Sequence, residues 1–370
     1  SIHLLSTEIA SQIAAGEVVE RPASVVKELL ENALDAGASH VQIQIEAGGQ
    51  RLVEVADNGW GIPENELELA TARHATSKLN SAEDLFNIRT LGFRGEALAS
   101  IGSVSRFTIT SRPSEAAAGM RLRVEGGKPG ALEAVGSPVG TVVRGEDLFY
   151  NVPARLKFLK TEATERRQID TLVTHYALAY PQVRFELRQE GRISLQTTGN
   201  GSRREVLAAL YGVEVARGML EVLTDEDGIQ VTGFTSPTSL TRSNRREITF
   251  FVNGRPVQDS ALTTAVLQAY HTLLMVGRFP LGTFFLEMDP AAVDVNVHPT
   301  KAEVRFREAS RVFSVVQRAV RRALLAHTPV PELDNTQLRW SAPSMWRGEP
   351  PRVDLSWEMA ASAGQAEMEP

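Results

Sequence analysis

The amino-acid sequence predicts an α+β fold, with a first domain of mixed sheet layered with helices and a smaller β-α-β domain after it. Three observations support this prediction. An amphipathic helix is expected over residues 21–35, because its apolar residues recur on one side. Residues 40–46 and 51–56 alternate between apolar and polar, which is typical of paired strands. After about residue 200 a second series begins, with helices expected at 203–211, 260–271 and up to 325, and strands between them.

The polar side of the helix over residues 21–35 carries chemically useful groups. Glu28 and Asn32 lie one turn apart and face the same way, with Glu31 and Asp35 nearby. Such a face is often only solvated surface. The strand pair that follows favours a functional interpretation.

The second strand of that pair stops at Asp57, which is followed by Gly59 and Gly61. A carboxylate in this position can accept a hydrogen bond from the exocyclic amine of a purine. Glycines without a Cβ atom let a flat ring approach the backbone. An ordinary Asp-Asn-Gly turn is the alternative interpretation.

Phosphate contacts are expected from a different glycine-rich segment, because the chain has no Gly-x-x-x-x-Gly-Lys-Ser/Thr sequence. Gly92, Phe93, Arg94 and Gly95 open a helix expected at 96–100, whose free N–H groups and positive end suit an anion. A mobile surface loop is the alternative interpretation of this segment. Upstream, residues 73–78 add hydroxyls and cations, including Lys78. Gly140 and Thr141 begin a strand in which the Thr141 hydroxyl is available near the purine ring.

In this order, Glu28-x-x-x-Asn32, Asp57-x-Gly59-x-Gly61, the 92–95 segment and Gly140-Thr141 resemble the four motifs of one ATPase superfamily. Type II topoisomerases, heat-shock protein 90, histidine kinases and MutL share these motifs. Within the superfamily, the segments 12–22, 72–78 and 294–301 resemble the signatures of the MutL family. The resemblance spans nearly all of residues 1–330.

The resemblance implies a Mg²⁺-dependent ATPase that binds ATP. Glu28 is expected to be the general base that polarises the attacking water, and Asn32 to give its side-chain oxygen to Mg²⁺. Lys301 is expected to reach the γ-phosphate from the second domain, so that ATP but not ADP favours domain docking. Glu31 is either a supporting residue or a solvated one.

Length and composition agree with two domains in 370 residues, of which 42% are hydrophobic. We expect an ATP-binding domain over 1–200, a second α/β domain over 201–330, and a disordered, acidic, proline-containing linker over 331–370. The chain has no cysteine, which excludes disulfides and thiolate metal sites. No segment resembles a membrane span or a signal peptide, so a cytoplasmic location is expected.

A net charge of −6 argues against a uniformly basic nucleic-acid binder, but two basic patches stand out. They predict weak, salt-sensitive, sequence-independent binding of DNA. Solvated surface charge is the alternative. The predicted DNA-binding residues are Arg155 and Lys157 in the first patch, and Arg242, Arg245, Arg246 and Arg255 in the second.

The family resemblance also implies partners. We expect an ATP-gated adaptor of DNA mismatch repair that passes a signal from a MutS-type recognition protein to a strand-cutting nuclease or a helicase. The apolar first 20 residues are expected to exchange between subunits of an ATP-induced homodimer. The C-terminal dimerisation domain of MutL relatives is absent from this sequence, so a monomer is expected without nucleotide. A topoisomerase-like ATPase, a histidine kinase and a non-enzymatic scaffold are the alternatives.

Overall fold

The computed structural model describes residues 15–16, 18–73, 75, 91, 95–294 and 304–327. Two sheets organise this part of the chain, each with its own hydrophobic core. Lys78, Gly92, Phe93, Arg94, Lys301, most of the N-terminal segment and the predicted linker over 331–370 lie outside the described residues. None of the described helices is both long and apolar enough to cross a membrane.

The first sheet has nine strands in the order β5-β4-β3-β7-β2-β1-β8-β9, with β6 beside β4. All of its neighbouring strands are antiparallel except β1 and β8, which makes the sheet mixed, as predicted. The strands are β1 (His40–Glu46), β2 (Leu52–Asp57), β3 (Arg106–Arg112), β4 (Gly119–Glu125), β5 (Lys128–Pro129), β6 (Glu133–Val135), β7 (Gly140–Glu146), β8 (Arg184–Gln189) and β9 (Arg192–Gln196).

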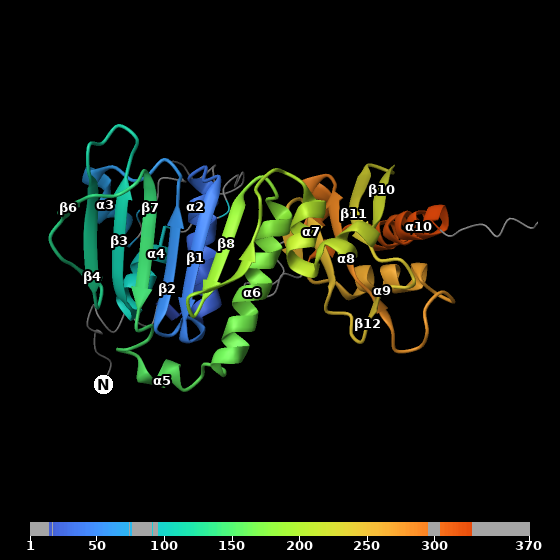
Figure 1. The fold of residues 1–370 in the computed structure, drawn as a ribbon, viewed down its shortest axis with the longest axis horizontal. Helices are drawn as coiled ribbons and strands as arrows, with labels where there is room; N and C mark the ends of the chain where they lie inside the picture. The colour runs from blue at the N-terminus through green and yellow to red at the C-terminus, as the bar shows by residue number, and fades with distance from the viewer. Residues whose placement is uncertain are drawn as a thin grey trace, which may run out of the picture. The chain divides into compact units, whose positions relative to one another are not determined.

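Helices α2 and α4 lie behind this sheet in Figure 1, and α6 packs beside α2. The opposite face is polar, since Glu54 of β2, Thr108 of β3 and Arg144 of β7 share it. There Arg144 binds Glu54 at 2.9 Å. The helices of this part are α2 (Pro22–Asp35), η1 (Ala47–Gly49), α3 (Glu64–Ala70), α4 (Ala97–Val104), α5 (Pro153–Leu156) and α6 (Glu162–Ala179).

The second sheet has five strands in the order β10-β11-β16-β13-β14, in which β13 and β16 run parallel. Helices α9 and α10 pack on each other, and their apolar faces build the second core. The strands are β10 (Leu220–Glu226), β11 (Ile229–Thr235), β12 (Thr241–Arg242), β13 (Ile248–Val252), β14 (Arg255–Val257), β15 (Phe279–Pro280), β16 (Gly282–Glu287), β17 (Val293–Asp294) and β18 (Arg305–Phe306). The helices are α7 (Arg203–Tyr211), α8 (Val213–Gly218), α9 (Ser260–Ala269), η3 (Pro290–Ala292) and α10 (Ala309–His327).

Helix α6 packs beside α2 and also contacts the second sheet. His175 of α6 meets the ring of Phe251 of β13 edge-on, with centroids 6.0 Å apart. Burial lowers the pKa of His175 to about 4, so its imidazole is neutral near pH 7. The contact is therefore an aromatic one without a charge.

Candidate nucleotide site

Helix α2 holds the first group of predicted site residues. Its apolar side packs Val25, Val26 and Leu29 into the core, so that Glu28 and Asn32 face away from it. The Glu28 side chain is 25% exposed. Helix α2 thus presents a carboxylate and an amide one turn apart, as the sequence predicts.

Asp57 ends β2 in a partly buried position. The N–H of Gly59 donates to its Oδ1 at 2.8 Å. Burial raises the pKa of Asp57 to about 6, although the backbone N–H groups of Gly59 and Thr141 oppose the shift. A desolvated acceptor of this kind suits an amine donor of a purine.

Thr141 lies directly across from Asp57, because the two residues are paired in the β2–β7 register. The Thr141 hydroxyl is 2.8 Å from the hydroxyl of Ser111 on β3. Ser111 also accepts the N–H of Ile62 at 2.7 Å, which fixes the loop after Gly61. Ser111 could not be predicted from the sequence, because its partners lie on two distant segments.

The structure gives the glycines of this turn a second reason beside the predicted approach of a purine ring. A Cβ atom on Gly59 would lie 2.6 Å from the carbonyl oxygen of Ala36, and Gly61 has a φ of +77°. These glycines therefore allow the turn to pass close to the end of α2 and to β3. Gly140, at the start of β7, comes closer still to this turn, since its Cβ would lie 2.0 Å from the carbonyl oxygen of Asp57.

The predicted phosphate segment is described only at its two ends. The N–H of Leu91 donates to Oδ1 of Asp35 at 3.0 Å, which fixes the start of the segment to α2. Gly95 has a φ of +63° and precedes α4. One end of the segment is therefore bonded to α2, the helix that carries Glu28 and Asn32, and the other end leads into α4. Helices α2 and α4 pack on each other.

Two side chains near Glu28 and Glu31, those of Lys27 and Tyr176, have no role assigned from the sequence. The Nζ of Lys27 lies 3.3 Å from Oε1 of Glu28 and 2.9 Å from Oε1 of Glu31. Glu31 is buried and accepts the hydroxyl of Tyr176, from α6, at 2.7 Å. Of the two alternatives for Glu31, the structure excludes the solvated one, because the side chain is buried.

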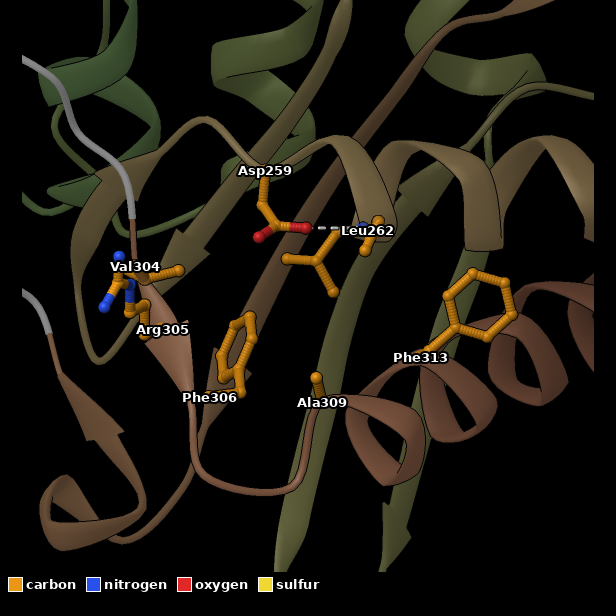
Figure 2. A pocket seen from close by; sticks show the side chains of 8 residues that line it. Asp259, Leu262, Val304, Arg305, Phe306, Ala309 and Phe313 are labelled. Carbon is orange, nitrogen blue, oxygen red and sulfur yellow. Dashed lines mark hydrogen bonds between the residues drawn. The ribbon is translucent and has the colours of Figure 1, made fainter. Parts of the chain in front are cut away.

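The donor set fits ATP and Mg²⁺ in chemical type. Glu28 and Asn32 offer oxygens, which are the ligands that Mg²⁺ prefers, and Asp57 offers a desolvated acceptor for an amine. A separate surface hollow of about 270 Å³ lies beside the second core, between Asp259, Phe306 and Phe313 (Figure 2). It includes no residue of α2 or of the Asp57 turn, so it is distinct from this site.

The predicted DNA-binding residues fall into three places. Arg245 and Arg246 are exposed in the loop after β12, and Arg242 binds Glu247 at 2.7 Å. The pairing of β12 with β15 brings this loop beside Arg278, which the sequence analysis missed because the pairing is long-range. Arg255 lies on β14, in the main second sheet.

The first basic patch contains one residue with a clear structural role. Arg155 donates to the carbonyl oxygen of Val19 at 2.8 Å and lies over the ring of Phe149. Lys157 is exposed. Lys157 is therefore the freer of these two cations for a phosphate.

Comparison with known proteins first defines the class. Residues 20–126 match the family described as histidine kinase-, DNA gyrase B- and HSP90-like ATPase. The B-subunit of DNA gyrase from Myxococcus xanthus shares the fold, with 16% identity and a TM-score of 0.55 over 88% of this chain and 98% of that one. The first part of the chain thus has the fold of this ATPase class.

The particular family follows from closer relatives. Residues 207–325 match the family described as DNA mismatch repair protein, C-terminal domain. The Aquifex aeolicus MutL ATPase domain, solved in complex with ADP, is 34% identical, with a TM-score of 0.59 over 74% of this chain and 94% of that one. MutL of Lactococcus lactis strain IL1403 is 46% identical over 336 residues, which are 90% of this chain and 51% of that protein. The chain belongs to the MutL family of DNA mismatch repair proteins, and it spans about half the length of the curated relatives it matches.

Proposed function

We propose that the chain binds and hydrolyses ATP with Mg²⁺, as the switch of a DNA mismatch-repair adaptor. The observation that carries the proposal is that the turn after Asp57 lies against the end of α2, the helix that presents Glu28 and Asn32, in a member of this family. The relative from Aquifex aeolicus was solved with ADP, which supports nucleotide binding here.

Each residue has a proposed task. Asp57 accepts the exocyclic amine of adenine, beside the hydroxyl of Thr141, and Asn32 supplies an oxygen to Mg²⁺. When bound, Mg²⁺ gathers the charge of the phosphates. Glu28 accepts a proton from the water that attacks the γ-phosphate. Lys78, Gly92, Phe93, Arg94 and Gly95 are proposed to hold the phosphates, and Lys301 to contact the γ-phosphate.

We further propose an ATP-driven switch. If Lys301 contacts only the γ-phosphate, ATP binds the docked arrangement of the domains (about 1–200 and 201–330) better than ADP does. The N-terminal segment then exchanges between two copies, and the dimer signals from a MutS-type protein to a nuclease or helicase. A cytoplasmic location is part of this proposal.

DNA is the proposed macromolecular ligand of the second part of the chain. Arg245, Arg246 and Arg278 are exposed on neighbouring loops. Residues 243–246 and 271–278 of these loops contain no acidic residue. Such a cluster suits a phosphate backbone rather than base readout. Arg242, Arg255, Arg155 and Lys157 remain predicted contributors.

The test measures ATP turnover and association state together. Glu28→Ala is expected to abolish turnover while nucleotide binding persists, because the carboxylate acts only in the chemical step. Light scattering with a non-hydrolysable ATP analogue and Mg²⁺ should show a dimer for the wild type and for Glu28→Ala, and a weaker one for Lys301→Ala. Undiminished turnover in Glu28→Ala contradicts the assignment of the base, and a monomer in every state contradicts the dimerisation.

A further inference from the structure

Glu31 is the starting point, because a buried carboxylate next to a catalytic one needs a physical reason. It is 7% exposed, and burial raises its pKa while Lys27 and Tyr176 oppose the shift. An ionised carboxylate in such a place is tolerated only when it is paired and hydrogen-bonded. Glu31 has both kinds of partner, a cation on its own helix and a hydroxyl from α6.

The two partners meet at one atom of Glu31. Tyr176 donates its hydroxyl to Oε1 at 2.7 Å, and the ammonium of Lys27 lies 2.9 Å from the same oxygen. Burial and the nearby Glu31 charge raise the pKa of Tyr176 well above its ordinary value, so it stays a donor. The phenol thus holds the carboxylate, and the carboxylate holds the ammonium.

Lys27 then reaches Glu28, the proposed base. Its Nζ lies 3.3 Å from Oε1 of Glu28, and the other oxygen of Glu28 makes no hydrogen bond to any residue that the structure describes. A lysine is a point charge on a flexible stem, and the Lys27 side chain is 46% exposed. Without Glu31 it would lose the closer of its two partners.

We propose that Tyr176, Glu31 and Lys27 form a positioning chain that orients Glu28 for catalysis, an inference that rests on the proposed ATPase function. Lys27 occupies one oxygen of Glu28 and leaves the other to face the attacking water. Glu31 holds the ammonium of Lys27 more closely than Glu28 does, at 2.9 Å against 3.3 Å, and so weakens the ion pair on the base. Tyr176 fixes Glu31 from a second helix, so the chain does not depend on α2 alone.

Tyr176 is well suited as the anchor of this chain. It is 7% exposed, and its ring stacks on that of Tyr180 with centroids 6.2 Å apart. The preceding residue, His175, packs against Phe251. Contacts on both sides limit the motion of this part of α6, so the Tyr176 hydroxyl is presented in one place.

The experiment compares Tyr176→Phe, Glu31→Gln and Lys27→Met in the full chain. Steady-state turnover gives kcat and KM for ATP, and competition with a fluorescent ATP analogue gives the nucleotide Kd. We expect kcat to fall about threefold in Tyr176→Phe and about tenfold or more in the other two, with Kd within about twofold, since an interaction used only in the chemical step is lost. Tyr180→Phe is the matched control, because it keeps the stacked ring and removes a hydroxyl that does not touch Glu31; its kcat should equal that of the wild type.

A double variant tests whether the residues act in sequence. Tyr176→Phe combined with Glu31→Gln should cost no more in kcat than Glu31→Gln alone, because the hydroxyl acts through the carboxylate. Unchanged kcat in the three single variants, a rise in kcat in Lys27→Met, or a change confined to KM overturns the positioning chain. Those results would leave the proposed function intact as long as Glu28→Ala abolishes turnover, whereas turnover in Glu28→Ala removes the proposed function itself.

Discussion

Replacement of Asp57 by Asn is expected to stabilise the nucleotide-free protein in a strongly pH-dependent way. The perturbation removes one ionisable group from a buried position and keeps its size. Burial raises the pKa of Asp57 from 3.8 to about 6, so the native state resists ionisation of this carboxyl. The folded wild-type protein thus binds this proton more tightly than the unfolded chain does.

The sign and the size follow from this difference in pKa. Because the pKa is higher in the folded protein, protonation of Asp57 contributes to the free energy of unfolding. This stabilising contribution is fully present below pH 3.8 and is lost as pH rises through about 6. The difference of about two pKa units corresponds to about 3 kcal/mol, because one unit is worth about 1.4 kcal/mol. Almost all of these roughly 3 kcal/mol of stability are lost at pH 8, and only about 0.5 kcal/mol of them at pH 4.

The assay is urea unfolding of the wild type and Asp57→Asn at pH 4 and pH 8. The Asn amide nitrogen cannot accept the N–H groups that the carboxylate accepts, so the absolute change at either pH includes a hydrogen-bond cost. The difference between the two pH values cancels that cost, together with every other titrating group. Between pH 4 and pH 8, the free energy of unfolding of Asp57→Asn is expected to rise by about 2–3 kcal/mol relative to that of the wild type.

The same variant should bind ATP poorly, because the amide presents a donor where adenine presents its own. This pairing of higher stability with lost binding is expected when a site holds a costly group for function. An equal effect of the substitution on unfolding at both pH values would refute the reasoning. It would mean that the Asp57 carboxyl is ionised in the folded protein at no cost.

Two further predictions follow from close contacts and charge. Gly140→Ala should lower the free energy of unfolding by about 3 kcal/mol or more, because Gly140 has a φ of +116° and the new Cβ would lie 2.0 Å from the carbonyl oxygen of Asp57. Gly136→Ala is the control, because a Cβ there meets no atom within 4 Å. Equal urea midpoints for the two variants would contradict the reasoning. Replacement of Arg245 and Arg246 by Glu should weaken DNA binding and reduce the slope of log affinity against log salt by about 2, since each phosphate contact contributes about 0.9. Arg217→Glu, at an exposed residue of α8, is the matched control, and an unchanged salt slope in the double variant would count against the basic loop.

The sequence was sufficient where the signal is local. Helix α2 was expected over residues 21–35 and runs Pro22–Asp35, and the strand over residues 40–46 coincides with β1. These elements follow from apolar periodicity, which one segment carries by itself. The placement of Thr141 opposite Asp57 was also within reach, because both belong to recognisable motifs.

The parts that escaped prediction depend on contacts between distant segments. Tyr176 lies 145 residues from Glu31, and nothing in its own helix distinguishes it from a core tyrosine. Lys27 resembles any lysine on a polar helix face until Glu31 and Glu28 are seen around it. The close backbone approach at the glycines of the Asp57 turn also escaped prediction, since it is a property of the assembled sheet and helix.

The position of α6 gives the proposed switch a physical basis in the described part of the chain. Residues 295–303, which carry Lys301, are bracketed by β17 and β18, and these strands pair through Val293 and Phe306. The ends of that segment are therefore fixed to the second part of the chain, which meets α6 where His175 packs against Phe251. The next residue of α6, Tyr176, bonds Glu31 beside the proposed base. One helix thus contacts both the part of the chain that carries the proposed phosphate sensor and the residues around the proposed base, which is the contact that the proposed switch requires.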